Sequence, residues 1–236
     1  MKATSNDNKT PVEARSPVEA FLAEARKAPV PAPEGGRGRL IFALDATMSR
    51  QPTWDMAQTL QGKMFETAAH SGGLDVQLVY FRGFGECRAS RFVQGGVGLS
   101  ALMSKIDVRG GHTQIGKVLK HVAAENAEAR VGAFVYIGDA MEEKPDDLAA
   151  LAGELGLRGV KGFVFQEGGA AATAATFKDI ARLTGGAYAA FDAHAAARLA
   201  ELLQAAAAYA AGGLAALQDE ARRGKEQARL LLRQMR

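Results

Sequence analysis

Three short stretches of the sequence carry oxygen-bearing side chains at spacings that suit a bound metal ion. Asp45, Thr47 and Ser49 supply a carboxylate and two hydroxyls at alternate positions, and alternate side chains of an extended loop point to one side. Thr113 follows a Gly-Gly turn, and Asp139 follows an apolar run. Carboxylate and hydroxyl oxygens suit Mg²⁺ rather than zinc. The five side chains would leave one coordination position for an external ligand.

The elements that must position these side chains alternate between strand and helix. Apolar runs typical of buried strands cover residues 40–44, 76–81, 131–137, 162–165 and 187–191. Helical apolar spacing covers residues 56–70, 115–127, 148–155 and 177–183, and residues 82–92 predict a hairpin. The pattern predicts an α/β fold with a doubly wound, mostly parallel sheet and one antiparallel edge strand.

A doubly wound sheet binds ligands beyond the carboxyl ends of its strands, where the strand order reverses. We expect the first strand and the strand over residues 131–137 to flank that reversal. Asp45 and Asp139 each follow one of these strands. The predicted topology would therefore bring the two carboxylates to the same edge.

Asp45-x-Thr47-x-Ser49, Thr113 after Gly-Gly and Asp139 after a strand resemble the metal-ion-dependent adhesion site (MIDAS) of von Willebrand factor A (VWA) domains. The element order extends the resemblance over about residues 38–210 and implies the Rossmann-like VWA fold. The sequence departs from the family pattern at two places. Thr47 stands where serine is commoner, and the turn around Asp139 reads Gly-Asp-Ala instead of Thr-Asp-Gly.

The resemblance implies a protein-binding module of the stand-alone bacterial type, with no catalysis of its own. It implies that Thr47, Ser49 and Thr113 bind Mg²⁺, or Mn²⁺, through hydroxyl oxygen. It implies that Asp45 and Asp139 act largely through bound water. A protein partner would then offer an Asp or Glu carboxylate as the last ligand.

Residues near these stretches are candidates for a partner-binding rim, namely Arg50, Trp54 and His112. Trp54 has two interpretations, because it also stands at the expected start of a helix. It is either an aromatic anchor on the binding face or a core residue. The sequence leaves both open.

Two alternatives compete with the metal site. In the first, Asp45 and Asp139 are ordinary strand-end residues that cap helices. In the second, the chain is a Mg²⁺-dependent phosphatase of the haloacid dehalogenase type with Asp45 as nucleophile. That chemistry wants a second carboxylate two residues after the nucleophile, where Thr47 stands. We therefore expect no enzyme activity.

The composition supports a globular domain with tails. The 236 residues are 47% hydrophobic and 23% charged, with a net charge of +3, which excludes a wholly disordered chain and makes nucleic acid an unlikely partner. Cys87 is the single cysteine, so we expect a cytoplasmic protein without disulfides. No secretory signal is visible, and the Ala-rich run over residues 205–217 predicts no membrane span.

The ends of the chain differ from its middle. Residues 1–37 are polar and rich in proline, which predicts a disordered or weakly helical arm. Residues 38–210 would form the VWA-like domain, and residues 211–236 a basic helical tail. An apolar spacing through this tail predicts a solvated helix that packs loosely on the domain, or a contact with a second partner.

Overall fold

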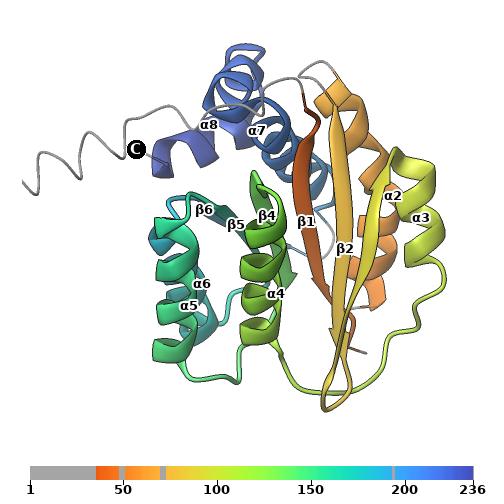
Figure 1. Ribbon diagram of the computed structural model, residues 1–236, viewed down its shortest axis with the longest axis vertical. Helices are drawn as coiled ribbons and strands as arrows, with labels where there is room; N and C mark the ends of the chain where they lie inside the picture. The colour runs from red at the N-terminus through yellow and green to blue at the C-terminus, as the bar shows by residue number, and fades with distance from the viewer. Residues whose placement is uncertain (1–35, 48–50, 70–72, 193–194, 236) are drawn as a thin grey trace, which may run out of the picture. The chain divides into compact units, whose positions relative to one another are not determined.

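The computed structural model describes residues 36–47, 51–69, 73–192 and 195–235 (Figure 1). The chain divides into two units, Met1–Val30 and Pro31–Arg236, and every described residue belongs to the second. The predicted arm over residues 1–37 therefore lies outside the described residues, except for its last two positions.

The second unit is built on a six-stranded sheet in the order β3-β2-β1-β4-β5-β6. Its strands are β1 (Gly38–Asp45), β2 (Leu74–Arg82), β3 (Glu86–Gln94), β4 (Ala133–Gly138), β5 (Lys161–Glu167) and β6 (Ala187–Phe191). All neighbours pair in parallel except β2 and β3, which form the predicted hairpin. The strand order reverses between β1 and β4, so the predicted doubly wound sheet with an antiparallel edge strand is confirmed.

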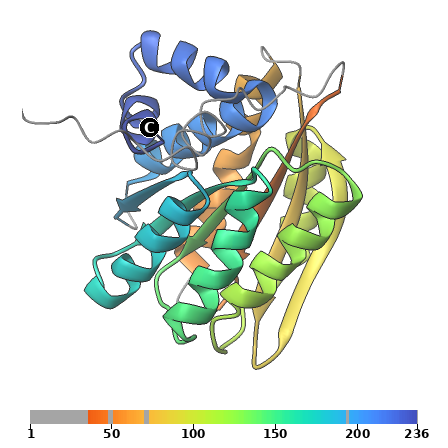
Figure 2. The same cartoon turned by 60° about the vertical axis from the view of Figure 1, so that its left-hand side comes forward.

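Helices cover both faces of the sheet (Figures 1 and 2). They are α2 (Gln51–Ala69), α3 (Gly96–Met103), α4 (Ile115–Glu128), α5 (Pro145–Leu157), α6 (Ala171–Leu183), α7 (Ala196–Arg222) and α8 (Glu226–Gln234). Side chains of β1 alternate between two cores: Ile41 and Ala43 pack with α4 to α6, whereas Leu40, Phe42 and Leu44 pack with α2, α3 and α7. Burial on both faces explains why the strands read as continuous apolar runs.

The C-terminal helices differ from the expected loose tail. The helix α7 is interrupted by non-helical backbone at Gly212 and Gly213, and it ends before Gly224, whose φ is 92°. The chain then turns, and α8 packs against α7 and β6 with Ala228 and Leu231 fully buried. The apolar spacing of the tail thus reflects packing on the domain. The boundary at residue 210 stays a prediction.

Within the described part of the chain, α7 is the one helix whose length and composition would allow it to cross a membrane. It is longer than the uncharged run from which no span was predicted. However, 61% of its most apolar window is buried inside the molecule. The helix contacts α2, β1, β2 and β4, so its apolar face serves the core of this structure.

Candidate metal centre

The end of β1 holds the first predicted group in a fixed turn. Asp45 is 3% exposed, and its Oδ1 accepts the Thr47 N–H at 2.8 Å. The N–H of Ala46 donates to Phe81 O at 3.0 Å, and its carbonyl accepts the Arg109 N–H at 3.0 Å. Asp45 and Thr47 are therefore buried at the carboxyl end of β1, between β2 and the loop before α4.

Thr113 is tied to the loop that follows β4. Its Oγ1 accepts the Glu142 N–H at 3.0 Å, and its own N–H donates to Glu142 Oε2 at 3.0 Å. The same carboxylate oxygen lies 2.8 Å from His112 Nδ1. The hydrogen bond from the Thr113 backbone, followed by that from His112, lowers the pKa of Glu142. This reciprocal pair fixes the Thr113 hydroxyl beside the β4 loop.

Asp139 is half-buried and directly follows β4. Because Leu44 of β1 pairs with Ile137 of β4, Asp45 and Asp139 leave the sheet at the same edge. The structure therefore brings the segments of Asp45, Thr47, Thr113 and Asp139 together where the strand order reverses. Ser49 and Arg50 lie outside the described residues.

The chemistry of these four side chains fits a hard divalent cation. They offer two carboxylates and two hydroxyls, and Asp45, Thr47 and Thr113 are at most 8% exposed. The described residues contain no group of three His, Cys, Asp or Glu side chains that could hold a metal. An ion at this edge would thus depend on hydroxyl oxygens, which suit Mg²⁺ or Mn²⁺.

The start of α4 is capped by a residue that the sequence did not suggest for this role. The Glu143 carboxylate accepts the N–H groups of Ile115 at 2.6 Å and Gly116 at 2.8 Å. These are the first N–H groups of α4, which have no partner within the helix. Glu143 therefore caps α4 from the loop after β4. Asp45 does bond its own turn, as the capping alternative expects.

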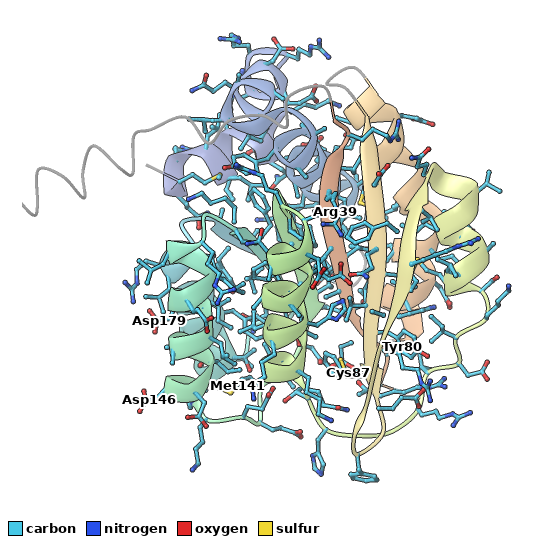
Figure 3. All side chains as sticks on the ribbon, in the orientation of Figure 1. Arg39, Tyr80, Cys87, Met141, Asp146 and Asp179 are labelled. Atoms are coloured by element: carbon cyan, nitrogen blue, oxygen red, sulfur yellow. The ribbon has the colours of Figure 1, made fainter. Side chains whose placement is uncertain are left out.

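We expect Glu143→Ala to lower the free energy of unfolding by about 1 kcal/mol, because two helix N–H groups lose an anionic acceptor. Asp146→Ala is the matched control. Asp146 is an exposed acidic residue in the first turn of α5 and points away from the body (Figure 3). Its loss should cost only a few tenths of a kcal/mol. Urea denaturation of both variants measures the difference, and equal losses would contradict the cap.

The turn between β2 and β3 is fastened to the segment that carries Thr113. The His112 N–H donates to Gly83 O at 3.1 Å, and Lys117 Nζ donates to Gly85 O at 2.8 Å. A Cβ on Gly111 would lie 2.1 Å from Gly83 O, so the Gly-Gly turn permits this close approach. Phe84 at the tip is 84% exposed, with its ring centroid 5.1 Å from that of His112.

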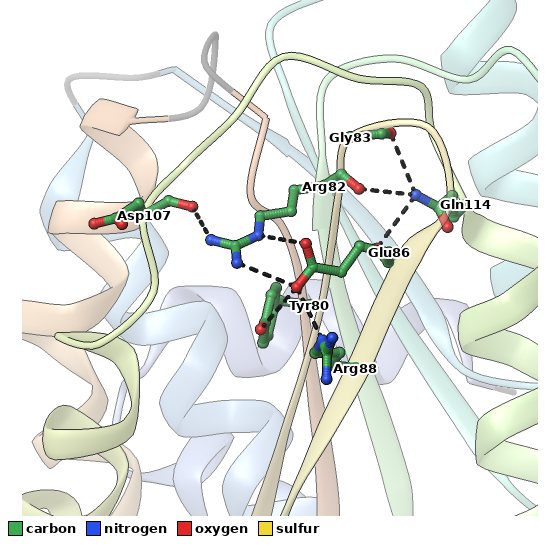
Figure 4. Close-up of polar contacts among 7 residues, drawn as sticks. All are labelled: Tyr80, Arg82, Gly83, Glu86, Arg88, Asp107 and Gln114. Atoms are coloured by element: carbon green, nitrogen blue, oxygen red, sulfur yellow. Dashed lines mark hydrogen bonds and ion pairs between the residues drawn. The ribbon is translucent and has the colours of Figure 1, made fainter.

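An ion-pair cluster holds the same hairpin from its other side (Figure 4). Arg82 donates to both carboxylate oxygens of Glu86, at 2.9 and 3.1 Å, and to Asp107 O at 2.6 Å. Arg88 also donates to Glu86 at 2.9 Å, and Gln114 Nε2 reaches the carbonyls of Arg82 and Glu86 at 3.3 Å. The hairpin is thus linked to the loop on each side of Thr113.

Glu86 should keep its charge to unusually low pH. The hydrogen bond from Arg82, and then that from Arg88, lowers its pKa from 4.5 to about 2. Because the folded-state pKa is depressed, its contribution to stability is fully present above pH 4.5 and is lost as the pH falls towards 2. In a carboxyl NMR titration, Arg82→Met should raise the pKa of Glu86 more than Arg88→Met does. An unchanged pKa in Arg82→Met would contradict this assignment.

Comparisons with known proteins show which fold this architecture belongs to. No protein-family model and no curated protein sequence matches the chain, but solved structures do. An aerotolerance-related membrane protein from Bacteroides fragilis aligns over 72% of this chain and 98% of its own, with a TM-score of 0.55 and 17% identity. The VWA domain of SpRpn10 aligns over 73% of this chain and 95% of its own, with a TM-score of 0.54 and 12% identity. The chain has the von Willebrand factor A fold.

A third match carries a metal at the family's site. Proximal thread matrix protein 1 from the mussel byssus, with a zinc-occupied MIDAS motif, aligns over 73% of this chain and 46% of its own. The TM-score is 0.52 and the identity 15%. At such identities the likeness shows the VWA fold, and the metal belongs to the other protein.

In this VWA fold, Trp54 does not lie on a binding rim. It is 2% exposed and packs in the core, and its ring centroid lies 6.4 Å from that of Tyr80 in an edge-to-face arrangement. The rim role expected of Trp54 is therefore corrected to the core alternative, because Trp54 packs among the buried residues between α2 and the sheet. The side chain of His112 is 64% exposed beside Thr113, and its rim role stays a prediction.

The sequence did not reveal the carboxylates whose hydrogen bonds fix the loops at the carboxyl ends of the strands. Glu142 and Glu143 fasten the loops, Glu86 fastens the hairpin, and Glu167 at the end of β5 accepts a hydrogen bond from Thr53 in α2. Glu142, Glu143 and Glu167 each bond a partner that lies 28 or more residues away in the chain. Only Glu142 and Glu143, adjacent to each other after a strand, offered a local signal.

Proposed function

We propose that this chain is a protein-binding module that depends on a divalent cation, Mg²⁺ or Mn²⁺. Asp45, Thr47, Thr113 and Asp139 would hold the ion, together with Ser49 as the sequence pattern predicts. The observation that supports the proposal is that three segments with oxygen-bearing side chains reach the same edge of the sheet, where the strand order reverses.

The residues have distinct parts in this proposal. When bound, the ion supplies positive charge and an open coordination position. Thr47 and Thr113 offer neutral oxygens, so the negative charge at the site comes from Asp45 and Asp139. The Glu142 N–H occupies one lone pair of Thr113 Oγ1, and the second lone pair of that hydroxyl oxygen would serve the ion. With few anionic donors, the site favours a carboxylate from a partner.

The structural neighbours support a binding role rather than a specific partner. They include the pilus adhesin SpaC from Lactobacillus rhamnosus GG, which aligns over 74% of this chain with a TM-score of 0.57 and 11% identity. This chain covers 30% of that adhesin. We propose a protein partner that offers an Asp or Glu side chain, and a cytoplasmic location on the basis of the lone Cys87.

The test is capture of a partner by the immobilised chain in Mg²⁺ or in excess chelator, with Asp45→Ala as the comparison. A partner retained only by the wild type in Mg²⁺ supports the proposal, and equal retention in chelator contradicts it.

The same preparations are assayed for Mg²⁺-dependent phosphate release from a phosphomonoester, which tests the phosphatase alternative. We expect no release, because Thr47 replaces the acid that such chemistry needs. Release that Asp45→Asn abolishes would favour the phosphatase.

A further inference from the structure

The outer edge of β6 accepts and donates hydrogen bonds with one side chain, that of Gln234, in the pattern that a neighbouring strand would make. The carbonyl of Phe191 accepts the Gly168 N–H at 3.0 Å and so faces β5. Main-chain groups alternate in direction along a strand, so those of Tyr188 and Ala190 face outward. Gln234 Oε1 accepts the Tyr188 N–H at 3.0 Å, and Gln234 Nε2 donates to Tyr188 O at 2.8 Å. One carboxamide thus makes both bonds that a strand residue would make.

This carboxamide is carried by the last turn of α8. The helix is anchored by Ala228 and Leu231, both fully buried, and by a hydrogen bond from Arg229 Nε to Ala221 O at 3.0 Å. No described residue bonds the outward main chain of Ala190. The end of α8 therefore covers the edge at one residue. An uncovered edge strand is a template for another strand.

We propose that the β6 edge is a strand-docking surface, that α8 occupies it in the monomer, and that its competing occupant is β6 of a second copy. The segment 187–191 contains no charged residue. In antiparallel pairing about Ala189, Tyr188 of one copy meets Ala190 of the other. Asp192 then lies opposite Gly186, so no like charges face each other.

The balance of hydrogen bonds explains why α8 holds the edge. Each Tyr188–Ala190 pair would exchange two main-chain bonds, so a symmetric dimer forms four. Formation of the dimer would break the two hydrogen bonds between Tyr188 and Gln234 in each copy, which is also four bonds in total. Pairing thus gains no hydrogen bonds while Gln234 is present, and it gains four once the carboxamide is removed. This inference is independent of the proposed metal site.

Hydrogen exchange of the Tyr188 amide in the full chain tests whether Gln234 of α8 protects the β6 edge. Gln234→Leu removes both bonds while keeping a side chain of similar size, and exchange at Tyr188 should become about tenfold faster. Gln218→Leu is the matched control, because Gln218 is exposed on α7, and it should leave this exchange unchanged. Unchanged exchange in Gln234→Leu would overturn the proposal.

Analytical ultracentrifugation tests whether two copies of the chain associate through β6 once α8 is displaced. Leu231→Asp places a charge at a buried anchor of α8 and should yield a dimer, and adding Ala190→Pro should restore the monomer because proline blocks pairing at that edge. A monomeric Leu231→Asp with fast Tyr188 exchange, or a dimer that survives Ala190→Pro, would overturn the proposal. If Leu231→Asp fails to melt cooperatively, Gln234→Leu decides: concentration-dependent association supports the docking surface, and a monomer at every concentration overturns it.

Discussion

Replacing Thr113 with valine should weaken Mn²⁺ binding by about 100-fold while the protein stays folded. Valine keeps the shape of threonine but removes the hydroxyl that the proposed site needs. The Glu142 N–H also loses its acceptor, which should lower the free energy of unfolding by about 1 kcal/mol. Titration calorimetry with Mn²⁺ measures the affinity, and a thermal melt without metal measures the stability.

Thr113→Ser is the control for this prediction, because serine retains the hydroxyl. It should bind Mn²⁺ within a few-fold of the wild type. Asp45→Asn should also lose Mn²⁺ binding, since it removes one of the two carboxylates at the edge. If Thr113→Val binds as tightly as Thr113→Ser, the hydroxyl is not a ligand.

Replacing Gly186 with alanine should lower the free energy of unfolding by about 3 kcal/mol or more. A Cβ at this position would lie 2.0 Å from Gly162 O and 2.6 Å from Gly162 C. Both atoms belong to the backbone of the adjacent strand, so no side-chain rotation relieves the overlap. The absence of a Cβ at Gly186 therefore lets the chain entering β6 approach β5 closely.

Gly153→Ala is the matched control in the same protein. Gly153 lies inside α5, and a Cβ there meets nothing within 4 Å. Alanine favours the helix over glycine, so this variant should gain about 0.5–1 kcal/mol. Urea unfolding of the two variants should therefore move in opposite directions. A small loss in Gly186→Ala would show that the strands can separate there.

The sequence predicted those parts of the fold that depend on local pattern. Apolar runs marked the buried strands, and Gly83-Phe84-Gly85 marked the hairpin turn. The helix α3 was not expected, because its sequence contains two glycines and has little helix preference. It forms where Leu99 and Met103 pack into the core. Tertiary packing of this kind leaves no local signal.

The residues of the candidate site also fall into those that local sequence pattern could predict and those that it could not. Asp45, Thr113 and Asp139 could be assigned to one edge because each follows a strand or opens a helix. Glu142 and Glu86 could not, since their roles depend on which loops meet after folding. The place of Trp54 was open for a related reason: helix position alone does not say which side of the first turn faces the sheet.

The packing of α7 has a consequence for how the protein is synthesised. The core side chains of β1 that face α2 also contact α7, the next-to-last helix of the chain. On the ribosome, β1, α2 and α3 emerge long before α7 exists, so the part of this face that α7 covers stays open through most of translation. The opposite face needs only α4 to α6 and can close earlier. Chaperones that bind nascent apolar surface should therefore engage the face that α7 will cover.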